Sequence, residues 1–228
     1  MGGSGSGGRF TVTNVIIAVN VGVFLLGLAR GNDVSNGRGD LSLRLGLAAD
    51  FINADHEYYR LITSGFLHFG IIHLGFNMLV LYRMGEVLEN GIGKLRFSAV
   101  YLAAMLAGSC GALIADPNAL TAGASGAVYG LFGALALGLR SRGASVWQSG
   151  IGPLIAINLL LTFTISGISA GGHIGGLVGG GLCAIGVFGP GAIAGRPTPH
   201  RPSVAIGLLS CLAVAVVAVI GALLAAAP

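Results

Sequence analysis

Residues 123–139 read GASGAVYGLFGALALGL, an apolar run that opens at Ser125. The run does not alternate between apolar and polar side chains as a half-buried strand would, so it predicts a helix. A second apolar run, residues 172–190, contains one histidine, His173. A serine hydroxyl is a weak nucleophile until a base removes its proton, and an ionisable side chain within an apolar helix usually has a function. The two runs together therefore make Ser125 and His173 candidates for nucleophile and base.

The composition predicts a membrane protein. Of the 228 residues, 54% are hydrophobic and only 9% are charged, whereas soluble domains have about 25% charged residues. The mean hydropathy is +0.86. The 41 glycines would let helix backbones approach closely in a bilayer. We therefore expect an all-α fold, a polytopic bundle of about seven transmembrane helices.

Seven apolar runs approach the roughly 20 residues that a transmembrane helix needs. The predicted spans are 12–29, 66–84, 97–115, 125–139, 148–166, 172–190 and 204–226. The expected organisation is a tag or flexible linker over 1–8, a six-helix core over 9–190, a cytoplasmic linker over 191–203 and an additional transmembrane helix over 204–228.

The basic residues suggest an orientation. If the N-terminus is cytoplasmic, eight of the twelve basic residues face the cytoplasm: Arg9, Arg83, Lys94, Arg96, Arg140, Arg142, Arg196 and Arg201. The other four share residues 30–65 with five acidic residues. The positive-inside rule favours this arrangement, in which Ser125 and His173 both lie near the outer face. Because the arginines flank apolar runs, the net charge of +4 does not indicate nucleic-acid binding. The excess of arginine over lysine and the richness in alanine and glycine suggest a GC-rich bacterial genome, so the expected location is a bacterial plasma membrane.

Taken alone, each candidate has a structural alternative. Ser125 has the side chain of a helix N-cap, and His173 could bond to a backbone carbonyl. Favouring function, glycines line both runs: Gly126, Gly130 and Gly133 in one, Gly175 and Gly179 in the other. Small faces of this kind would let the helices approach closely enough for a hydrogen bond between Ser125 and His173.

Three further residues could complete a hydrolytic site. Tyr129 lies one helical turn after Ser125 and could stack against His173. His73 and Asn77 are four residues apart in the second predicted span and point the same way. Two donors aimed at one point would stabilise an oxyanion by roughly 3–4 kcal/mol each. The alternative for Asn77 is a bond between helices worth about 1 kcal/mol.

Taken together, these motifs resemble the rhomboid family of intramembrane serine proteases. The resemblance rests on Gly123-Ala124-Ser125-Gly126 with Tyr129, on His68, His73 and Asn77 as His-x4-His-x3-Asn, on the glycine-flanked His173, on Tyr59-Arg60, and on Glu89 with Gly93 and Arg96. It covers nearly the whole chain after residue 8. Two positions depart from the usual pattern, since Gly172 replaces an alanine and Tyr59 replaces a tryptophan.

The resemblance implies an intramembrane serine endopeptidase with a Ser125–His173 dyad and no third acid. It also implies that the Ser125 N–H, His73 and Asn77 hold the oxyanion. Gly123, Ala124, His68 and Tyr129 would support these groups, and Arg60 and Glu89 would be structural. The implied partners are transmembrane protein substrates and the lipid bilayer, and the first outer loop would lie partly in the membrane. The fifth span and the loop after it would act as a gate. No metal or cofactor is implied.

Other classes of membrane protein fit less well. The zinc signature HExxH is absent from the sequence. Gly37-Arg38-Gly39-Asp40 matches an aspartyl-protease pattern but lies in a polar loop without a partner aspartate in any span. A transporter would need polar residues along a path through the bilayer. The main alternative is a non-catalytic rhomboid-like protein that binds membrane clients.

Overall fold

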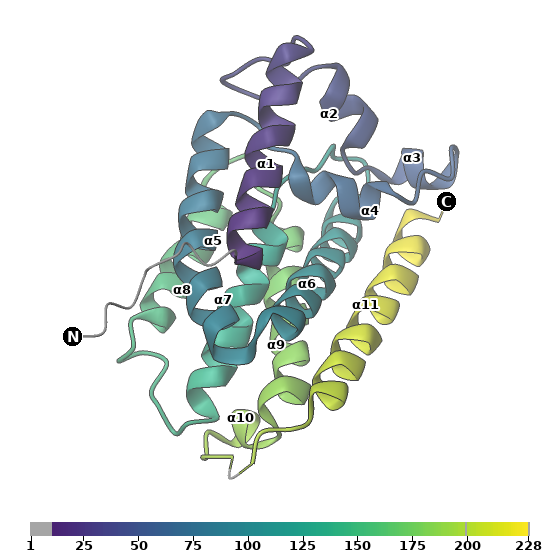
Figure 1. Cartoon of the computed structure of the whole chain (residues 1–228). Helices are drawn as coiled ribbons and strands as arrows, with labels where there is room; N and C mark the ends of the chain where they lie inside the picture. Colours follow the sequence, from purple (N-terminus) through teal and green to yellow (C-terminus); the bar gives the residue numbers. More distant parts are fainter. Residues whose placement is uncertain (1–10, 199, 228) are drawn as a thin grey trace, which may run out of the picture.

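The computed structural model describes residues 11–198 and 200–227, so the predicted linker 1–8 and Arg9 lie outside the described residues. The described residues contain α-helices, one 3₁₀ turn and no β-strand, which confirms the all-α fold (Figure 1). The elements are α1 (Val12–Ala29), α2 (Asp40–Leu45), α3 (Ala49–Asn53), α4 (Arg60–Thr63), η1 (Ser64–Phe66), α5 (Ile71–Ile92), α6 (Lys94–Ala115), α7 (Ser125–Arg140), α8 (Ile151–Thr164), α9 (Ala170–Phe188), α10 (Gly191–Ala194) and α11 (Val204–Ala226).

Seven of these helices correspond to the predicted spans. Within the described part of the chain, five are long and apolar enough to cross a membrane: α1, α5, α6, α9 and α11. The other two, α7 and α8, are shorter apolar helices of 16 and 14 residues. Large apolar side chains on the outer faces of the bundle are exposed, as expected where lipid replaces water. The protein is a multi-pass membrane protein.

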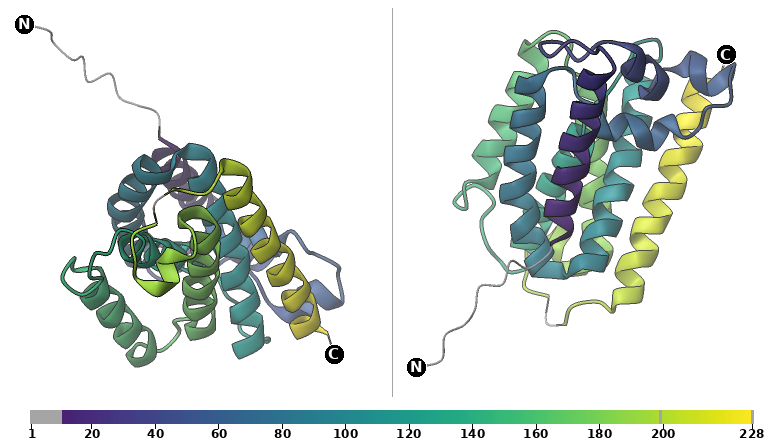
Figure 2. Two further views of the ribbon diagram at one scale, coloured as in Figure 1. Left: turned by 90° about the horizontal axis from the view of Figure 1, so that it is seen from below. Right: turned by 45° about the horizontal axis from the view of Figure 1, so that its top comes forward.

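The helices surround a central group formed by α6, α7 and α9, which pack against one another. Helices α8 and α11 lie at opposite sides of the bundle (Figure 2). The short helices α2–α4 lie at one end, beside the C-terminal end of α11 (Figure 1). Because the chain reverses at each turn, α7 and α9 both begin at this same end. The fold therefore places Ser125 and His173 at one end of the bundle.

Glycine allows α7 and α9 to pack backbone against backbone. A Cβ atom added at Gly176 would overlap the carbonyl group of Gly126, and one at Gly180 would overlap that of Gly130. The sequence analysis correctly predicted the glycines of α7 that meet α9, which are Gly126, Gly130 and Gly133. It did not correctly predict the glycines of α9 that meet α7. Gly175 and Gly179 contact α6, at Ala107 and Gly111 among others. The face that meets α7 includes Gly176, Gly180 and the carbonyl group of Gly172.

The second predicted span, 66–84, is displaced in the structure. Helix α5 begins at Ile71 because Gly70 adopts φ +95°, outside the helical region. It continues to Ile92 and is joined to α6 by Gly93 alone. His68 consequently precedes the helix. Arg83, expected at the end of that span, lies in the middle of α5, and Lys94 and Arg96, expected in the loop before the next span, lie in the first turn of α6.

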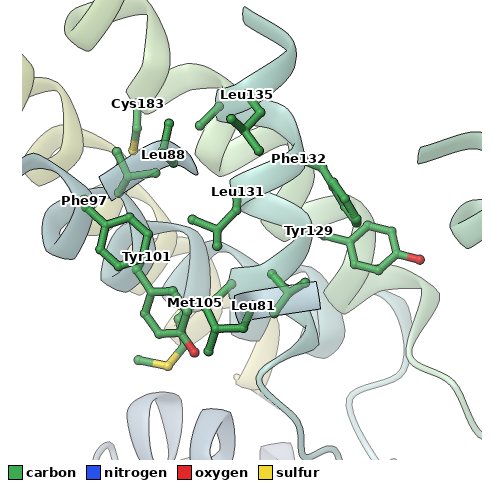
Figure 3. Packing of buried hydrophobic residues seen from close by; sticks show 14 of the residues in the cluster. Leu81, Leu88, Phe97, Tyr101, Met105, Tyr129, Leu131, Phe132, Leu135 and Cys183 are labelled. Carbon is green, nitrogen blue, oxygen red and sulfur yellow. The ribbon is translucent and has the colours of Figure 1, made fainter. Parts of the chain in front are cut away.

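The interior of the bundle is apolar and aromatic. Phe97, Tyr101 and Leu131 are at most 1% exposed, and Figure 3 shows their side chains filling the space between α6 and α7. Tyr129 lies at the edge of this cluster, and its hydroxyl points away from the other labelled side chains (Figure 3). The core therefore holds the Tyr129 ring while leaving its polar end for other contacts.

Helix α1 is attached to the bundle by Glu89. The carboxylate accepts hydrogen bonds from the backbone N–H groups of Val12 and Thr13, at 2.8 and 2.9 Å, and from the Thr13 hydroxyl at 2.8 Å. These are the first residues of α1, where N–H groups lack partners within the helix and a negative charge is favourable. Glu89 therefore joins α1 to α5 by capping it.

The loop before α7 is held by backbone bonds to the first long loop, residues 30–70 between α1 and α5. Leu47 and Thr121 exchange two N–H···O bonds of 2.9 and 2.8 Å. The Gly123 N–H donates to the Ser64 carbonyl at 2.9 Å. The segment that leads into Ser125 is thus fixed on two sides by main-chain groups.

The predicted linker 191–203 contains the short helix α10. Arg140, at the end of α7, donates to the backbone carbonyls of Ala192 and Ile193. Arg96 donates to the Pro202 carbonyl at 2.6 Å. This segment is therefore packed against the bundle at the end away from Ser125.

Replacing Gly176 by alanine tests the backbone contact between α7 and α9. The added methyl group would meet the rigid backbone of Gly126, so we expect a loss of about 1–3 kcal/mol in the free energy of unfolding. The measurement is denaturant unfolding in mixed micelles. The matched control is Gly181→Ala in the same helix, where the nearest atom is Leu137 Cδ1 at 4.0 Å. Equal stability of the two variants would contradict the proposed packing constraint.

Candidate active site

Ser125 is the first residue of α7. Ala124 occupies the N-cap position and makes no side-chain capping bond, so the alternative that Ser125 is the N-cap is wrong. The first backbone bond of the helix joins the Val128 N–H to the Ala124 carbonyl at 3.0 Å. The N–H groups of Ser125 and the next residues precede that bond and lack partners within the helix. Ser125 is partly buried and stands beside polarised N–H groups that suit a negative charge.

His173 lies in the first turn of α9, which is capped by the Ser169 hydroxyl. The side chain is buried, at 7% exposure. Its ring stacks on Tyr129, with a centroid separation of 4.0 Å and an angle of 17° between the planes. This is the contact that the sequence predicted. A Cβ at Gly126 would lie 3.3 Å from the carbonyl oxygen of Gly172, so the two backbones meet one residue from both Ser125 and His173.

The predicted hydrogen bond between Ser125 and His173 is not formed. Within the described residues, the Ser125 hydroxyl has no hydrogen-bond partner, and the Nδ1 atom of His173 is 2.7 Å from the Thr162 hydroxyl. Hydrogen bonds between catalytic groups are often long in unliganded sites and shorten when substrate binds. Because Thr162 contacts Nδ1, the other ring nitrogen remains for the serine.

His73 faces Ser125 across Gly123. The Phe69 N–H donates to His73 Nδ1 at 3.3 Å, so the ring hydrogen belongs on Nε2 in the neutral form. An idealised Cβ position on Gly123 would lie 3.1 Å from His73 Nε2 and 3.5 Å from Ser125 Oγ. Gly123 also adopts φ +139°, which L side chains rarely reach. The glycine therefore opens the space in which His73 can present a hydrogen-bond donor near the serine.

Asn77 and His68 flank His73. Asn77 is 7% exposed, and its amide donates to the backbone carbonyl of His73 at 3.0 Å. This bond uses one of its two amide hydrogens. The ring of His68 packs edge-on against that of His73, with centroids 5.1 Å apart. His68 thus contacts His73 from the loop before α5.

Arg60 organises the loop between α1 and α5. Its guanidinium donates to the carbonyls of Leu43 and Gly46 at 2.7 and 2.6 Å and pairs with Glu57 at 2.5 Å. It also lies over the Phe51 ring, 3.9 Å from the centroid. The side chain is 3% exposed. Arg60 therefore gathers three parts of this loop around one buried cation.

The sequence analysis did not identify Thr162 as a residue of the site. It contacts both Tyr129 and His173, at 2.8 and 2.7 Å between the polar atoms. The available signal was Asn158-x3-Thr162, two polar residues one turn apart in an apolar run. Such a pair is unfavourable facing lipid and indicates a helix face that turns inward.

The structure also shows the surroundings of Asp40, the aspartate of the pattern at residues 37–40 that resembles an aspartyl protease. Asp40 pairs with Arg44 at 2.8 Å, and both side chains are largely exposed, as in an ordinary surface ion pair. Among the residues that the structure describes, no group of three or more His, Cys, Asp or Glu side chains could hold a metal ion.

Comparison with known proteins finds one family. The model of the Rhomboid domain family matches residues 55–190. Rhomboid protease GluP of Bacillus subtilis is 36% identical over 192 residues, which cover 80% of this chain and 37% of that protein. Putative rhomboid protease YdcA of the same organism is 36% identical over 131 residues, covering 56% of this chain and 66% of that protein. The chain thus spans less than two thirds of the length of both relatives.

One similar protein carries a different description. Inactive RHOMBOID-like protein 8 of Arabidopsis thaliana is 30% identical over 117 residues, which cover 51% of this chain and 33% of that protein. Similarity at this level therefore occurs with proteins named as proteases and with one named as inactive. The residues at the site have to distinguish the two cases.

The first long loop should lose stability in acid because of Glu57. Its carboxylate accepts hydrogen bonds from the Tyr59 hydroxyl and from Arg60, both at 2.6 Å, which lower its pKa below the usual 4.5. A lowered pKa in the folded state gives a stabilisation that is present above about pH 4.5 and is lost as the pH falls through the lower, folded-state value. We expect the melting temperature to fall over that range, and the fall to be smaller in Glu57→Gln. The control is Asp55→Asn, which neutralises an exposed carboxylate in the same loop. If Asp55→Asn reduced the acid-induced fall in melting temperature as much as Glu57→Gln does, the assignment to Glu57 would be contradicted.

Proposed function

The chain belongs to the rhomboid family, and we propose that it is an intramembrane serine endopeptidase with Ser125 as nucleophile and His173 as general base. The observation that carries the proposal is the stack of Tyr129 on His173, one helical turn from Ser125. That stack fixes an imidazole beside a serine whose own helix offers unpaired N–H groups. A nucleophile, a positioned base and oxyanion donors are the parts that acyl transfer requires.

The reaction begins with proton transfer from the Ser125 hydroxyl to Nε2 of His173. The serine oxygen attacks the carbonyl carbon of a peptide bond, and the carbonyl oxygen becomes negatively charged. The Ser125 N–H, Nε2–H of His73 and the free amide hydrogen of Asn77 would stabilise that charge. The protonated His173 then gives its proton to the amine nitrogen as the C–N bond breaks, which leaves an ester on Ser125. Water next loses a proton to His173 and attacks the ester carbon, and His173 returns that proton to the Ser125 oxygen as the C–O bond breaks and the carboxylic acid product leaves.

The substrates are transmembrane segments of other membrane proteins. Ser125 begins a helix of 16 residues, which is about 24 Å long. The hydrocarbon core of a bilayer is about 30 Å thick. If the opposite end of α7 reaches its membrane surface, Ser125 lies below the other surface. A nucleophile at that depth would meet peptide bonds at the end of a membrane-spanning helix.

The proposed location is a bacterial plasma membrane, with the N-terminus cytoplasmic and the site opening to the outer face. The end of the bundle away from Ser125 includes Lys94, Arg140, Arg142, Arg196 and Arg201. The acidic residues of the first long loop lie at the end that contains Ser125. This distribution of charge supports the orientation under the positive-inside rule.

A non-catalytic protein that binds membrane clients is the alternative. One similar protein is named as inactive, and family membership alone does not separate the two functions. The presence of Ser125, His173 and a glycine at position 123 favours catalysis, because a binding protein has no need of these groups. Proteins lacking activity would be free to replace them.

Labelling by a fluorophosphonate tests the nucleophile and the base directly. We expect the native protein to be labelled, and Ser125→Ala and His173→Ala to lose both labelling and cleavage of a helical membrane substrate. The matched controls are Ser166→Ala, an exposed serine at the same end of the bundle, and His200→Ala, an exposed histidine at the other. Undiminished cleavage by Ser125→Ala would refute the nucleophile. If the native protein is folded, as shown by cooperative thermal unfolding, but is not labelled, the client-binding alternative would be favoured.

The oxyanion donors are tested by His73→Phe and Asn77→Ala. Each removes a donor while leaving the nucleophile and base, so we expect kcat to fall by about 10²–10³ with little change in KM. The measurement is steady-state cleavage in detergent or liposomes. Asn14→Ala is the control, because Asn14 is exposed on α1 at the opposite end. Native kcat in both site variants would remove these residues from the mechanism.

A further inference from the structure

Three polar groups converge on one buried hydroxyl in α8. The Thr162 oxygen is 2.7 Å from Nδ1 of His173, 2.8 Å from the Tyr129 hydroxyl and 2.8 Å from the backbone carbonyl of Asn158. Thr162 is 3% exposed. All three neighbours are within hydrogen-bond distance, so the hydroxyl must serve each of them either as donor or as acceptor.

The number of hydrogens decides which role applies. A threonine hydroxyl has one hydrogen and two lone pairs, and a carbonyl oxygen can only accept. The Thr162 hydrogen therefore goes to Asn158, and the two lone pairs accept from the Tyr129 hydroxyl and from an N–H at Nδ1 of His173. If Thr162 instead donated to His173, its oxygen would face the Asn158 oxygen at 2.8 Å with no hydrogen between them. Only the first arrangement satisfies all three contacts.

We propose that Thr162 is a positioning residue that holds His173 in the tautomer with hydrogen on Nδ1 and an unprotonated Nε2. This inference rests on the proposed function, in which Nε2 takes the proton of Ser125. After that transfer both ring nitrogens carry hydrogen, and the Nδ1–H bond to Thr162 is retained. A third group that orients the base is a recurrent part of nucleophilic sites. Here a neutral hydroxyl takes the place that a carboxylate occupies elsewhere.

The position of Thr162 also connects the base to the outermost part of the bundle. Helix α8 lies at the side of the molecule (Figure 2), and its buried residues are Gly152 and Thr162. Thr162 is thus the buried contact of α8 at the end near Ser125. An outward displacement of that end would remove the acceptor from both Tyr129 and His173. The tautomer of the base therefore depends on whether α8 is in place.

The experiment compares Thr162→Val, Thr162→Ser and Thr164→Val. The first removes the hydroxyl with little change of shape, and the second restores a hydroxyl. The third is the matched control, because Thr164 is an exposed threonine of α8 whose hydroxyl bonds to the carbonyls of Leu160 and Leu161. All variants are purified as the full chain, and thermal unfolding checks that they fold.

The deciding measurement is ¹⁵N NMR of histidine-labelled protein at a pH where the imidazole is neutral. The His173 signal is assigned from its loss in His173→Ala. We expect Nδ1–H in the native protein, Thr162→Ser and Thr164→Val, and a mixture of tautomers or Nε2–H in Thr162→Val. Nε2–H in the native protein, or an unchanged tautomer in Thr162→Val, would overturn the inference. This measurement needs no activity, so it separates this inference from the proposed function.

Kinetics provide the second measurement. Because general-base catalysis contributes about 10²–10⁴ in rate, we expect kcat of Thr162→Val to fall by about tenfold to a hundredfold with KM nearly unchanged. Thr162→Ser and Thr164→Val should stay within about threefold of native. Equal losses in the valine and serine variants at position 162 would show that shape, and not the hydroxyl, is responsible, and would contradict the inference.

Discussion

The contact between the backbones of α7 and α9 is the constraint on which the site depends. Ser125 and His173 come from different helices, and each lies next to a glycine at the point where those helices meet, Gly126 and Gly172. Side chains at Gly176 and Gly180, where an added Cβ would overlap the carbonyl groups of Gly126 and Gly130, would push the two helices apart and move Ser125 away from His173. The bilayer provides no hydrophobic force between helices, so close packing of small residues supplies the attraction. The same glycines therefore assemble the bundle and bring serine and histidine together.

The sequence was sufficient to predict the helices and to single out most of the polar residues that the structure brings together near Ser125, because apolar length and polar residues within apolar runs are local properties. It was insufficient to predict which face of each helix contacts which neighbouring helix. On α9, Gly175 and Gly179 form one stripe and Gly172, Gly176 and Gly180 another, and spacing alone does not say which stripe meets α7. The glycines of α9 contact three neighbouring helices, α6, α7 and α11, and the relative positions of these helices are a property of the whole fold.

Two other failures have different causes. The start of α5 depends on the positive φ of Gly70, which the apolar pattern across residues 66–71 conceals. Thr162 was overlooked because a threonine hydroxyl can bond to its own helix, as it does to Asn158, and such residues are then tolerated in apolar helices without further partners. Its contacts with Tyr129 and His173 arise from tertiary packing, so they are visible only once the three helices are placed.

The bonds between Leu47 and Thr121 and between Ser64 and Gly123 join main-chain groups, which every residue except proline possesses in full. Their strength consequently does not depend on which side chains the first long loop carries. That loop can exchange its outward-facing residues over evolutionary time, and so change what it meets at the membrane surface, while the segment before Ser125 keeps its place. Recognition and chemistry can in this way diverge at different speeds within one small molecule.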